Sequence, residues 1–171
     1  MPDDVVVRCA LRAGVELDRP LLRNLRRELR HAEAIAVAGR TLRRRDVSTN
    51  RLAEDLARAG VAPSTARSAV GVLAEAKLLD DARVAASRAR ALAERGWGDA
   101  AIATRLEAEG FAEDEARQAI GGLPAETSRA AKVAARVRDR HKAWRLLARR
   151  GFDETTVETV LDEWTGDSRA G

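Results

Sequence analysis

The chain has 171 residues, of which 34% are charged and 3% aromatic, and its formal net charge is +4. Few prolines, and apolar residues that are mostly Ala, Leu and Val, indicate an all-helical protein with a thin core. One cysteine excludes an internal disulfide, and no apolar run reaches the roughly 20 residues that span a bilayer. We therefore expect a cytoplasmic protein that does not contact membranes.

Residues 1–20 stand apart from the pattern that follows and are interpreted as an N-terminal extension. Acidic residues precede the first apolar run, which is not the order found in a secretory signal peptide. The apolar run continues as VVVRCAL, residues 5–11, and its β-branched residues predict a short strand.

Three glycines, Gly60, Gly110 and Gly151, mark an internal repeat. Each has a leucine four residues before it, and apolar residues one, six, ten and thirteen positions after it. A glycine in the left-handed conformation ends a helix, and Pro63, a run of acids or Asp153 as N-cap then starts the next one. Each copy therefore predicts two short helices joined at the glycine.

A longer helix precedes each pair, so the sequence predicts three tandem three-helix repeats in an all-α fold. The repeats are expected at residues 21–77, 78–123 and 124–166, followed by a flexible tail at residues 167–171. The long helix of the third repeat is expected to run through AETSRAAKVAARVRDRHK. Ser48 is interpreted as the N-cap of the first short helix.

Trp97 lies between Gly96 and Gly98, at the corner between the long and short helices of the second repeat. The glycines allow a sharp turn, and Gly98 is placed at the N-cap of the short helix. The indole is interpreted as an anchor in a core of small residues, with an exposed platform for a nucleobase as the alternative. Upstream, Asp80 and Asp81 are interpreted as a helix cap in preference to a metal-binding or acid pair.

The stretch AKLLDDARVAASRARALAERGWGDAAIATRLEAEGF resembles the central signature of the RecX regulatory proteins. LRRRDVSTNRLAEDLARAG resembles the family's Arg-x-x-Ser-x-x-x-Leu segment, and RLLARRGFDETTVETVL resembles its Arg-Arg-Gly-Phe motif. The resemblance covers roughly residues 30–164. The chain departs from the family at Val84, where Phe is usual, and at Lys77, where Gly is usual. The signature residues are Asp80, Asp81, Gly96, Trp97 and Gly98, with the repeat glycines Gly60, Gly110 and Gly151.

The resemblance implies an elongated, curved helical array that binds the groove of the RecA recombinase filament and bridges neighbouring subunits. It further implies that the protein opposes filament growth and restrains the ATPase, strand-exchange and co-protease activities of RecA. The protein would then act in DNA repair, recombination regulation and the SOS response. We expect a monomer, with single- or double-stranded DNA as a possible second partner.

Basic residues gather in two segments, whereas the middle of the chain is mildly acidic. Residues 19–45 carry nine arginines against two acids, and residues 129–150 carry nine basic residues against one acid. These are either solvated helix faces or contacts with an acidic protein surface or with phosphate. The candidate partner-binding residues are Arg43, Arg44, Arg45, Arg136, Arg140, Lys142, Arg145, Arg149 and Arg150.

No catalytic constellation is recognised in the sequence. His31 and His141 are interpreted as solvated helix residues, no His/Cys cluster is spaced for zinc, and no Gly-x-x-x-x-Gly-Lys loop occurs. We therefore expect neither an enzyme nor a bound metal or cofactor.

Two further functions compete with a RecA regulator: a helix-turn-helix DNA-binding protein and a helical-repeat scaffold for another partner. Acids open the second short helix of the second and third repeats, and they would repel DNA phosphate. Only PSTAR in the first repeat is compatible with insertion into a DNA groove.

Overall fold

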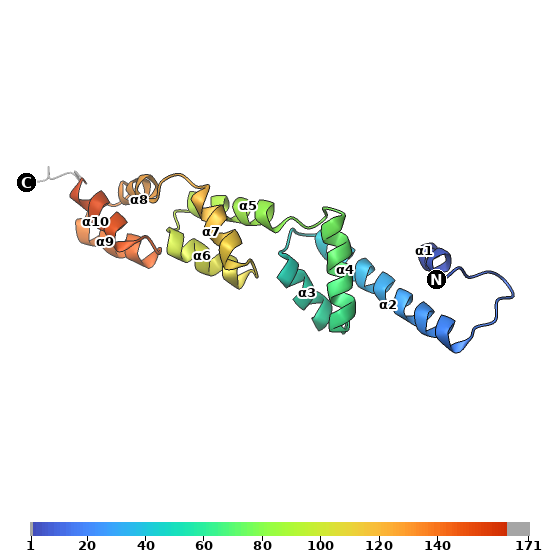
Figure 1. The fold of residues 1–171 in the computed structure, drawn as a ribbon. Helices are drawn as coiled ribbons and strands as arrows, with labels where there is room; N and C mark the ends of the chain where they lie inside the picture. Colours follow the sequence, from blue (N-terminus) through green and yellow to red (C-terminus); the bar gives the residue numbers. More distant parts are fainter. Residues whose placement is uncertain (1, 164–171) are drawn as a thin grey trace, which may run out of the picture. The chain divides into compact units, whose positions relative to one another are not determined.

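The computed structural model describes residues 2–163, and over this range it contains ten α-helices and no strand (Figure 1). The predicted all-helical fold class is confirmed. The end of the third predicted repeat and the tail at residues 167–171 lie outside the described residues. The chain divides into two compact units, Met1–Asp80 and Asp81–Gly171, which are described separately.

The first unit contains α1 (Asp3–Arg8), α2 (Arg19–Leu42), α3 (Thr49–Arg58) and α4 (Pro63–Glu75). α4 packs against both α2 and α3, and one hydrophobic cluster joins the three helices. The buried members of the cluster are Ala34, Ala38, Val47, Leu52, Leu56, Ala66, Ala69, Val70, Leu73 and Leu79. Alanines at the contact let α2 and α4 lie close together, as expected for a core of small residues.

α1 is a helix, so the strand predicted for residues 5–11 is wrong. Asp3 and Asp4 lie in its first turn, where carboxylates complement the helix dipole, and Arg8 in the last turn pairs with Asp4 at 2.6 Å. α1 packs on α2 and buries Val5. The charges at the two ends and this tertiary contact outweigh the β-preference of three consecutive valines.

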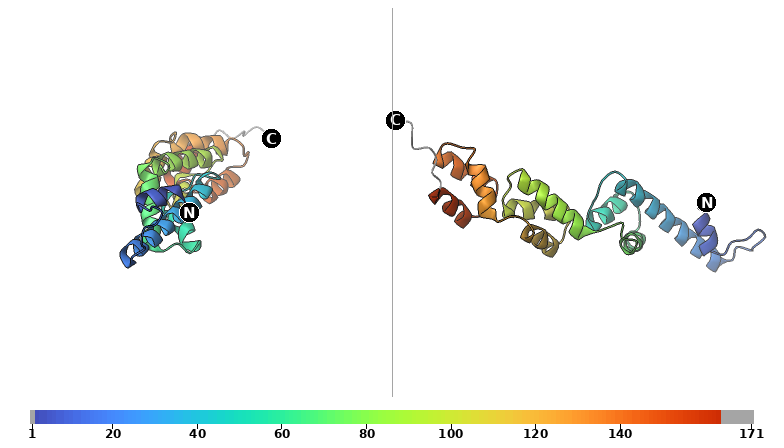
Figure 2. Two further views of the ribbon diagram at one scale, coloured as in Figure 1. Left: turned by 90° about the vertical axis from the view of Figure 1, so that its right-hand side faces the viewer. Right: turned by 90° about the horizontal axis from the view of Figure 1, so that it is seen from above.

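The second unit contains six helices in two groups of three. They are α5 (Asp81–Glu94), α6 (Asp99–Ala108) and α7 (Glu113–Gly121), then α8 (Glu126–Ala134), α9 (Arg140–Arg149) and α10 (Glu154–Asp162). Each group encloses its own hydrophobic cluster, and the views in Figure 2 show α8, α9 and α10 together in orange and red. The three hydrophobic clusters found within residues 2–163 are consistent with three repeats, and the repeat boundaries stay a prediction.

The repeat glycines end α3, α6 and α9 in the left-handed conformation. The angle φ is +82° at Gly60, +89° at Gly110 and +74° at Gly151. The residue after each glycine donates its N–H to the carbonyl of the leucine four residues before that glycine, at 3.0, 3.1 and 3.2 Å respectively. The helix ends identified in the sequence are therefore confirmed, together with their mechanism.

Short polar side chains start several helices as predicted. Ser48 accepts a hydrogen bond from the N–H of Arg51 at 3.2 Å and caps α3. Asp153 accepts from the N–H of Thr155 at 3.0 Å and caps α10. α5 begins at Asp81, so the preceding aspartate lies at its N-cap position.

The long basic helix predicted for the third repeat is wrong. α8 ends at Ala134, and a turn covers the residues before α9 begins at Arg140. The carboxylate of Asp139 accepts the N–H of Lys142 at 2.7 Å and so caps a new helix. The basic segment is thus divided between the end of α8, a turn and α9.

Candidate functional site

The Gly-Trp-Gly turn between α5 and α6 lies against the turn between α9 and α10. The N–H of Gly98 donates to the carbonyl of Arg150 at 2.9 Å. A β-carbon on Gly98 would overlap the backbone of Gly151 and Phe152, so this close approach requires glycine. Two motifs that carry the family resemblance, separated in sequence, are therefore two sides of one contact.

The flanking glycines of this contact are constrained as well. Gly96 has φ of +80°, and a β-carbon on it would lie 2.9 Å from a methyl carbon of Val133 and 2.6 Å from Nη1 of Arg150. A β-carbon on Gly151 would lie 2.6 Å from Cβ of Ala101. Larger residues here would have to displace neighbouring side chains or backbone.

A buried arginine of α8 holds the same turn. Arg129 is 6% exposed, and it donates to the carbonyls of Trp97 at 2.9 Å and Pro124 at 3.0 Å. Its guanidinium also pairs with the carboxylate of Asp99 at the start of α6. The buried charge of Arg129 is therefore balanced by one carboxylate, and its N–H groups are hydrogen-bonded to two carbonyls.

Glu126, in the first turn of α8, caps the start of α6 and also contacts the first turn of α10. Its carboxylate accepts from the N–H of Asp99 at 2.7 Å and from the hydroxyl of Thr156 at 3.1 Å. Gly98 does occupy the N-cap position of α6, as predicted, but it has no side chain to make the cap. Sequence reasoning missed Glu126 and Arg129 because their contacts with α6, α10 and the Trp97 turn join residues 27 to 32 positions apart.

Trp97 is half-buried at the edge of the cluster formed by α5, α6 and α7. The guanidinium carbon of Arg105 lies 3.7 Å from the centroid of its ring, and that of Arg150 lies 5.8 Å away. The ring thus interacts with cations of its own chain. This geometry favours the packing interpretation over a platform for a nucleobase.

Replacing Trp97 with alanine should lower the free energy of unfolding by about 2 kcal/mol, because a half-buried ring loses less than a fully buried one. Trp97→Phe should lose about half as much, since it keeps a ring at the same corner. Urea denaturation followed by circular dichroism measures both changes. A Trp97→Ala variant as stable as the parent would show that the ring contributes nothing to packing.

The candidate basic residues of the second unit divide into two sets. Arg140 pairs with Asp162 at 2.9 Å and donates to the carbonyl of Leu161, and Arg150 donates to the carbonyl of Arg95 at 2.6 Å. These two arginines hold the fold together. The second set is exposed and forms no ion pair among the residues that the structure describes: Arg136, Lys142, Arg145 and Arg149.

The basic residues Arg43, Arg44 and Arg45 belong to the first unit and are exposed at the end of α2. Arg45 pairs with Asp55 of α3 at 3.1 Å, which reduces the charge available to a partner. Of the three, Arg43 and Arg44 are therefore the stronger candidates for binding a partner.

The two histidines differ in their surroundings. His141 is exposed on α9, as predicted. His31 is half-buried, and its Nε2 atom is covered by protein without a hydrogen-bond partner among the described residues. The interpretation of His31 as a solvated residue is therefore wrong, because α2 turns this position toward α4.

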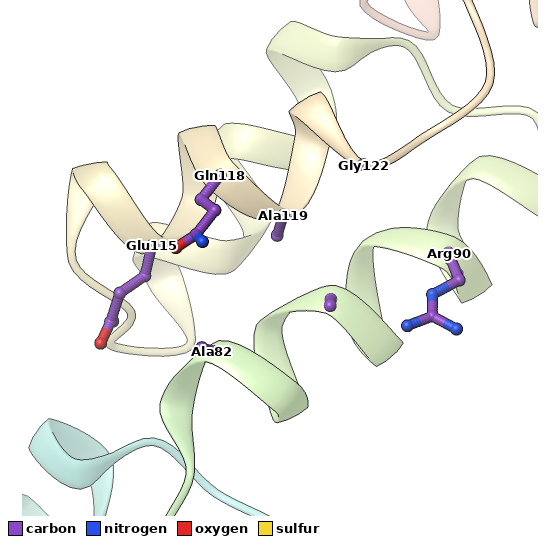
Figure 3. A pocket seen from close by; sticks show the side chains of 7 residues that line it. Ala82, Arg90, Glu115, Gln118, Ala119 and Gly122 are labelled. Atoms are coloured by element: carbon purple, nitrogen blue, oxygen red, sulfur yellow. The ribbon is translucent and has the colours of Figure 1, made fainter.

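α5 and α7 face each other across a hollow of about 400 Å³ (Figure 3). Ala82 of α5 and Ala119 of α7 line it, with the longer side chains of Arg90, Glu115 and Gln118. This lining offers no nucleophile paired with a base. Within residues 2–163, no group of three His, Cys, Asp or Glu side chains is placed to hold a metal, and no helix has the length and apolar character needed to cross a membrane.

No protein-family model matches the chain. The chain is 37% identical over 131 residues to the regulatory protein RecX of Chromohalobacter salexigens, an alignment covering 71% of this chain and 86% of that protein. The chain belongs to the RecX family. The resemblance inferred from its motifs is thereby confirmed.

Solved RecX structures share the helical fold. A crystal structure of regulatory protein RecX matches with a TM-score of 0.81 at 19% identity, covering 94% of this chain and 85% of that one. RecX from Lactobacillus salivarius matches with a TM-score of 0.73 at 16% identity, covering 78% of this chain and 96% of that one.

Lys77, where the resemblance led us to expect Gly, has φ of +55°. An L side chain is strained in this left-handed region, whereas glycine is not. Lys77→Gly should therefore raise the free energy of unfolding by about 0.5–1 kcal/mol. Gly60→Ala is the matched control, because Gly60 has φ of +82° and open space around it, and it should lower stability by about 1 kcal/mol. Equal urea midpoints for the parent and Lys77→Gly would show that the left-handed conformation of Lys77 does not lower the stability of the protein.

Proposed function

We propose that the protein binds RecA filaments and opposes their growth, restraining the ATPase, strand-exchange and co-protease activities of RecA. It would do so in the cytoplasm, as a monomer without a cofactor and without enzymatic activity of its own, in DNA repair and the SOS response. The observation that carries the proposal is the 37% identity to a regulatory protein RecX over 86% of that protein's length.

The exposed cations of α9 support this proposal. Lys142, Arg145 and Arg149 have no acidic partner among the described residues, and they repel one another in the free protein. A polyanionic partner such as a filament assembled on DNA would relieve this repulsion. Arg136 adds to the same charge from the turn after α8.

The proposal is tested by co-sedimentation with RecA filaments on single-stranded DNA and by the ATP turnover of those filaments. The protein should sediment with the filaments and lower their ATP turnover, and the purified protein alone should hydrolyse no ATP. Filaments that turn over ATP at an unchanged rate with excess protein bound would point to a scaffold for another partner.

Charge reversal on α9 should weaken attachment to the filament. The triple variant Lys142→Glu, Arg145→Glu and Arg149→Glu should bind at least tenfold more weakly at physiological salt, because exposed charges act over about 8 Å under these conditions. Arg140 is left unchanged, because it holds α9 to the end of α10. Co-sedimentation across a salt titration measures the effect.

A charge-matched control separates a local surface from net charge. The triple variant Arg67→Glu, Arg90→Glu and Arg95→Glu makes the same charge change at exposed positions on α4, on α5 and directly after α5. This control should retain most of the binding. If both triple variants lose binding equally, the effect comes from net charge and α9 is only a solvated face.

A further inference from the structure

The two helix groups of the second unit, α5–α7 and α8–α10, have separate apolar interiors. Among the described residues their hydrophobic clusters have no member in common, and the extensive helix-to-helix contacts of this unit all lie within one group or the other. Apolar burial therefore stabilises each group and does not explain how one group is held to the other. The attachment consists mainly of polar contacts made by the turn between α5 and α6.

Arg150, directly after α9, brings a positive charge to the end of α5. Its guanidinium donates to the carbonyl of Arg95 at 2.6 Å and to the carbonyl of Gly96 at 3.3 Å. These carbonyls follow the last turn of α5, which contains no basic residue and ends in Glu94. Because a helix carries partial negative charge at its C-terminal end, the guanidinium stabilises the end of α5.

Glu126 of α8 brings a negative charge to the start of α6. Gly98 at the N-cap position makes no side-chain cap, and the carboxylate of Glu126 accepts the N–H of Asp99 at 2.7 Å instead. Between the two helix ends, Arg129 donates to the carbonyl of Trp97 at 2.9 Å. The backbone of this turn therefore obtains its hydrogen-bond partners from the next helix group.

The equivalent turns of the other two groups are closed by their own residues. Ser48 caps α3 from within the first group, and Asp139 caps α9 from within the last group. In the middle group the equivalent position is Gly98, and its missing side chain allows the close approach of Gly151. The middle group thus has a glycine in place of a local cap, and the next group supplies the cap.

We propose that Glu126, Arg129 and Arg150 act as a clasp that couples the two groups, so that all six helices open and close as one cooperative body. A change in the stability of α9 or α10, whether from a substitution or from a bound partner, is then transmitted to α6. Without the clasp the two groups would open independently, as weakly coupled repeats do. The proposal concerns the free protein, so its test is independent of the proposed binding to RecA.

Amide hydrogen exchange of the full-length protein, followed by mass spectrometry across a range of low urea concentrations, tests this coupling. In the parent, the slowest amides of α6 and α9 should have protection factors within about threefold of each other, because both exchange through the same opening. The two protection factors should also fall in parallel as the urea concentration rises, since the same surface is exposed in each case. Different protection factors with different urea dependences in the parent would overturn the proposal.

Asp153→Ala is the variant that detects transmission between the groups. The carboxylate of Asp153 caps α10, and its hydrogen bonds lie within that helix of the last group. Loss of one cap should raise exchange roughly fivefold, and in a coupled body the increase should be equal in α9 and α6. Exchange that rises in α9 while α6 stays at the parent level would show that the groups open independently and would overturn the proposal.

The double variant Glu126→Ala and Arg150→Ala breaks the clasp itself. The protection factors of α6 and α9 should then differ by roughly tenfold or more, because hydrogen bonds to charged groups are among the stronger ones. Glu113→Ala with Arg117→Ala is the charge-matched control, since it removes one acid and one arginine that form an exposed ion pair within α7, and it should leave the two factors equal. Equal factors in the clasp variant as well would contradict the proposal. If that variant does not fold, the parent and Asp153→Ala decide.

Discussion

Replacing Gly98 with alanine should destabilise the second unit by about 3 kcal/mol or more. A β-carbon at this position would overlap backbone atoms of Gly151 and Phe152, and backbone cannot move aside as a flexible side chain can. Relief of the overlap would also break the hydrogen bond from Gly98 to the carbonyl of Arg150, which contributes about 1 kcal/mol. Urea denaturation followed by circular dichroism measures the loss.

Gly121→Ala is the matched control for this variant. Gly121 is the last residue of α7 in the same unit, and a β-carbon on it would meet no atom within 4 Å. Alanine favours a helix over glycine, so this variant should match the parent or gain up to about 1 kcal/mol. Similar midpoints for Gly98→Ala and Gly121→Ala would show that the two turns are not in close contact in solution.

Arg129→Ala should lower the free energy of unfolding by about 3 kcal/mol. The substitution leaves the carbonyls of Trp97 and Pro124 and the carboxylate of Asp99 without their donor. Removal of one partner from a buried, hydrogen-bonded pair typically costs about 3–5 kcal/mol, and the partial exposure of Asp99 places the expected value at the lower end. Thermal or urea unfolding reports the change.

Two further variants separate charge from packing at this site. Arg129→Met keeps the apolar stem and should remain about 2 kcal/mol less stable than the parent, because the polar partners are still unpaired. Arg138→Ala, at an exposed position in the turn before α9, should change stability by less than about 0.5 kcal/mol. If Arg129→Ala and Arg138→Ala unfold at the same urea concentration or temperature, the buried network does not contribute to stability.

Signals that act between neighbours in the chain were sufficient to predict much of this fold from the sequence. The left-handed glycines at positions 60, 110 and 151 end their helices as expected, and Ser48 and Asp153 cap the helices that follow them. These signals are local, because a cap or a helix end satisfies backbone groups within about one turn. The all-helical class and membership of the RecX family were predicted from the same motifs.

Local reasoning failed where a tertiary contact or a competing local signal decided the outcome. Three valines predicted a strand, but α1 forms with acids in its first turn and packs on α2. The run of basic residues predicted one helix, but Asp139 starts a second one. In both places the local preference for one type of secondary structure was weak, and hydrogen bonds, charges and packing outweighed it.

Only the tertiary structure decided which side chains form the sites. The contact of Gly98 with Gly151 joins positions 53 residues apart, and Arg129 binds partners about 30 residues away. A pattern in neighbouring residues therefore predicts neither contact. In the sequence Trp97 lies between two glycines and Trp144 lies in a basic segment, and neither setting shows which ring is covered in the fold. Packing places Trp97 against the α5–α7 cluster, where Arg105 lies over its ring, and leaves Trp144 exposed, because the stripe of α9 that becomes buried is set by α8 and α10.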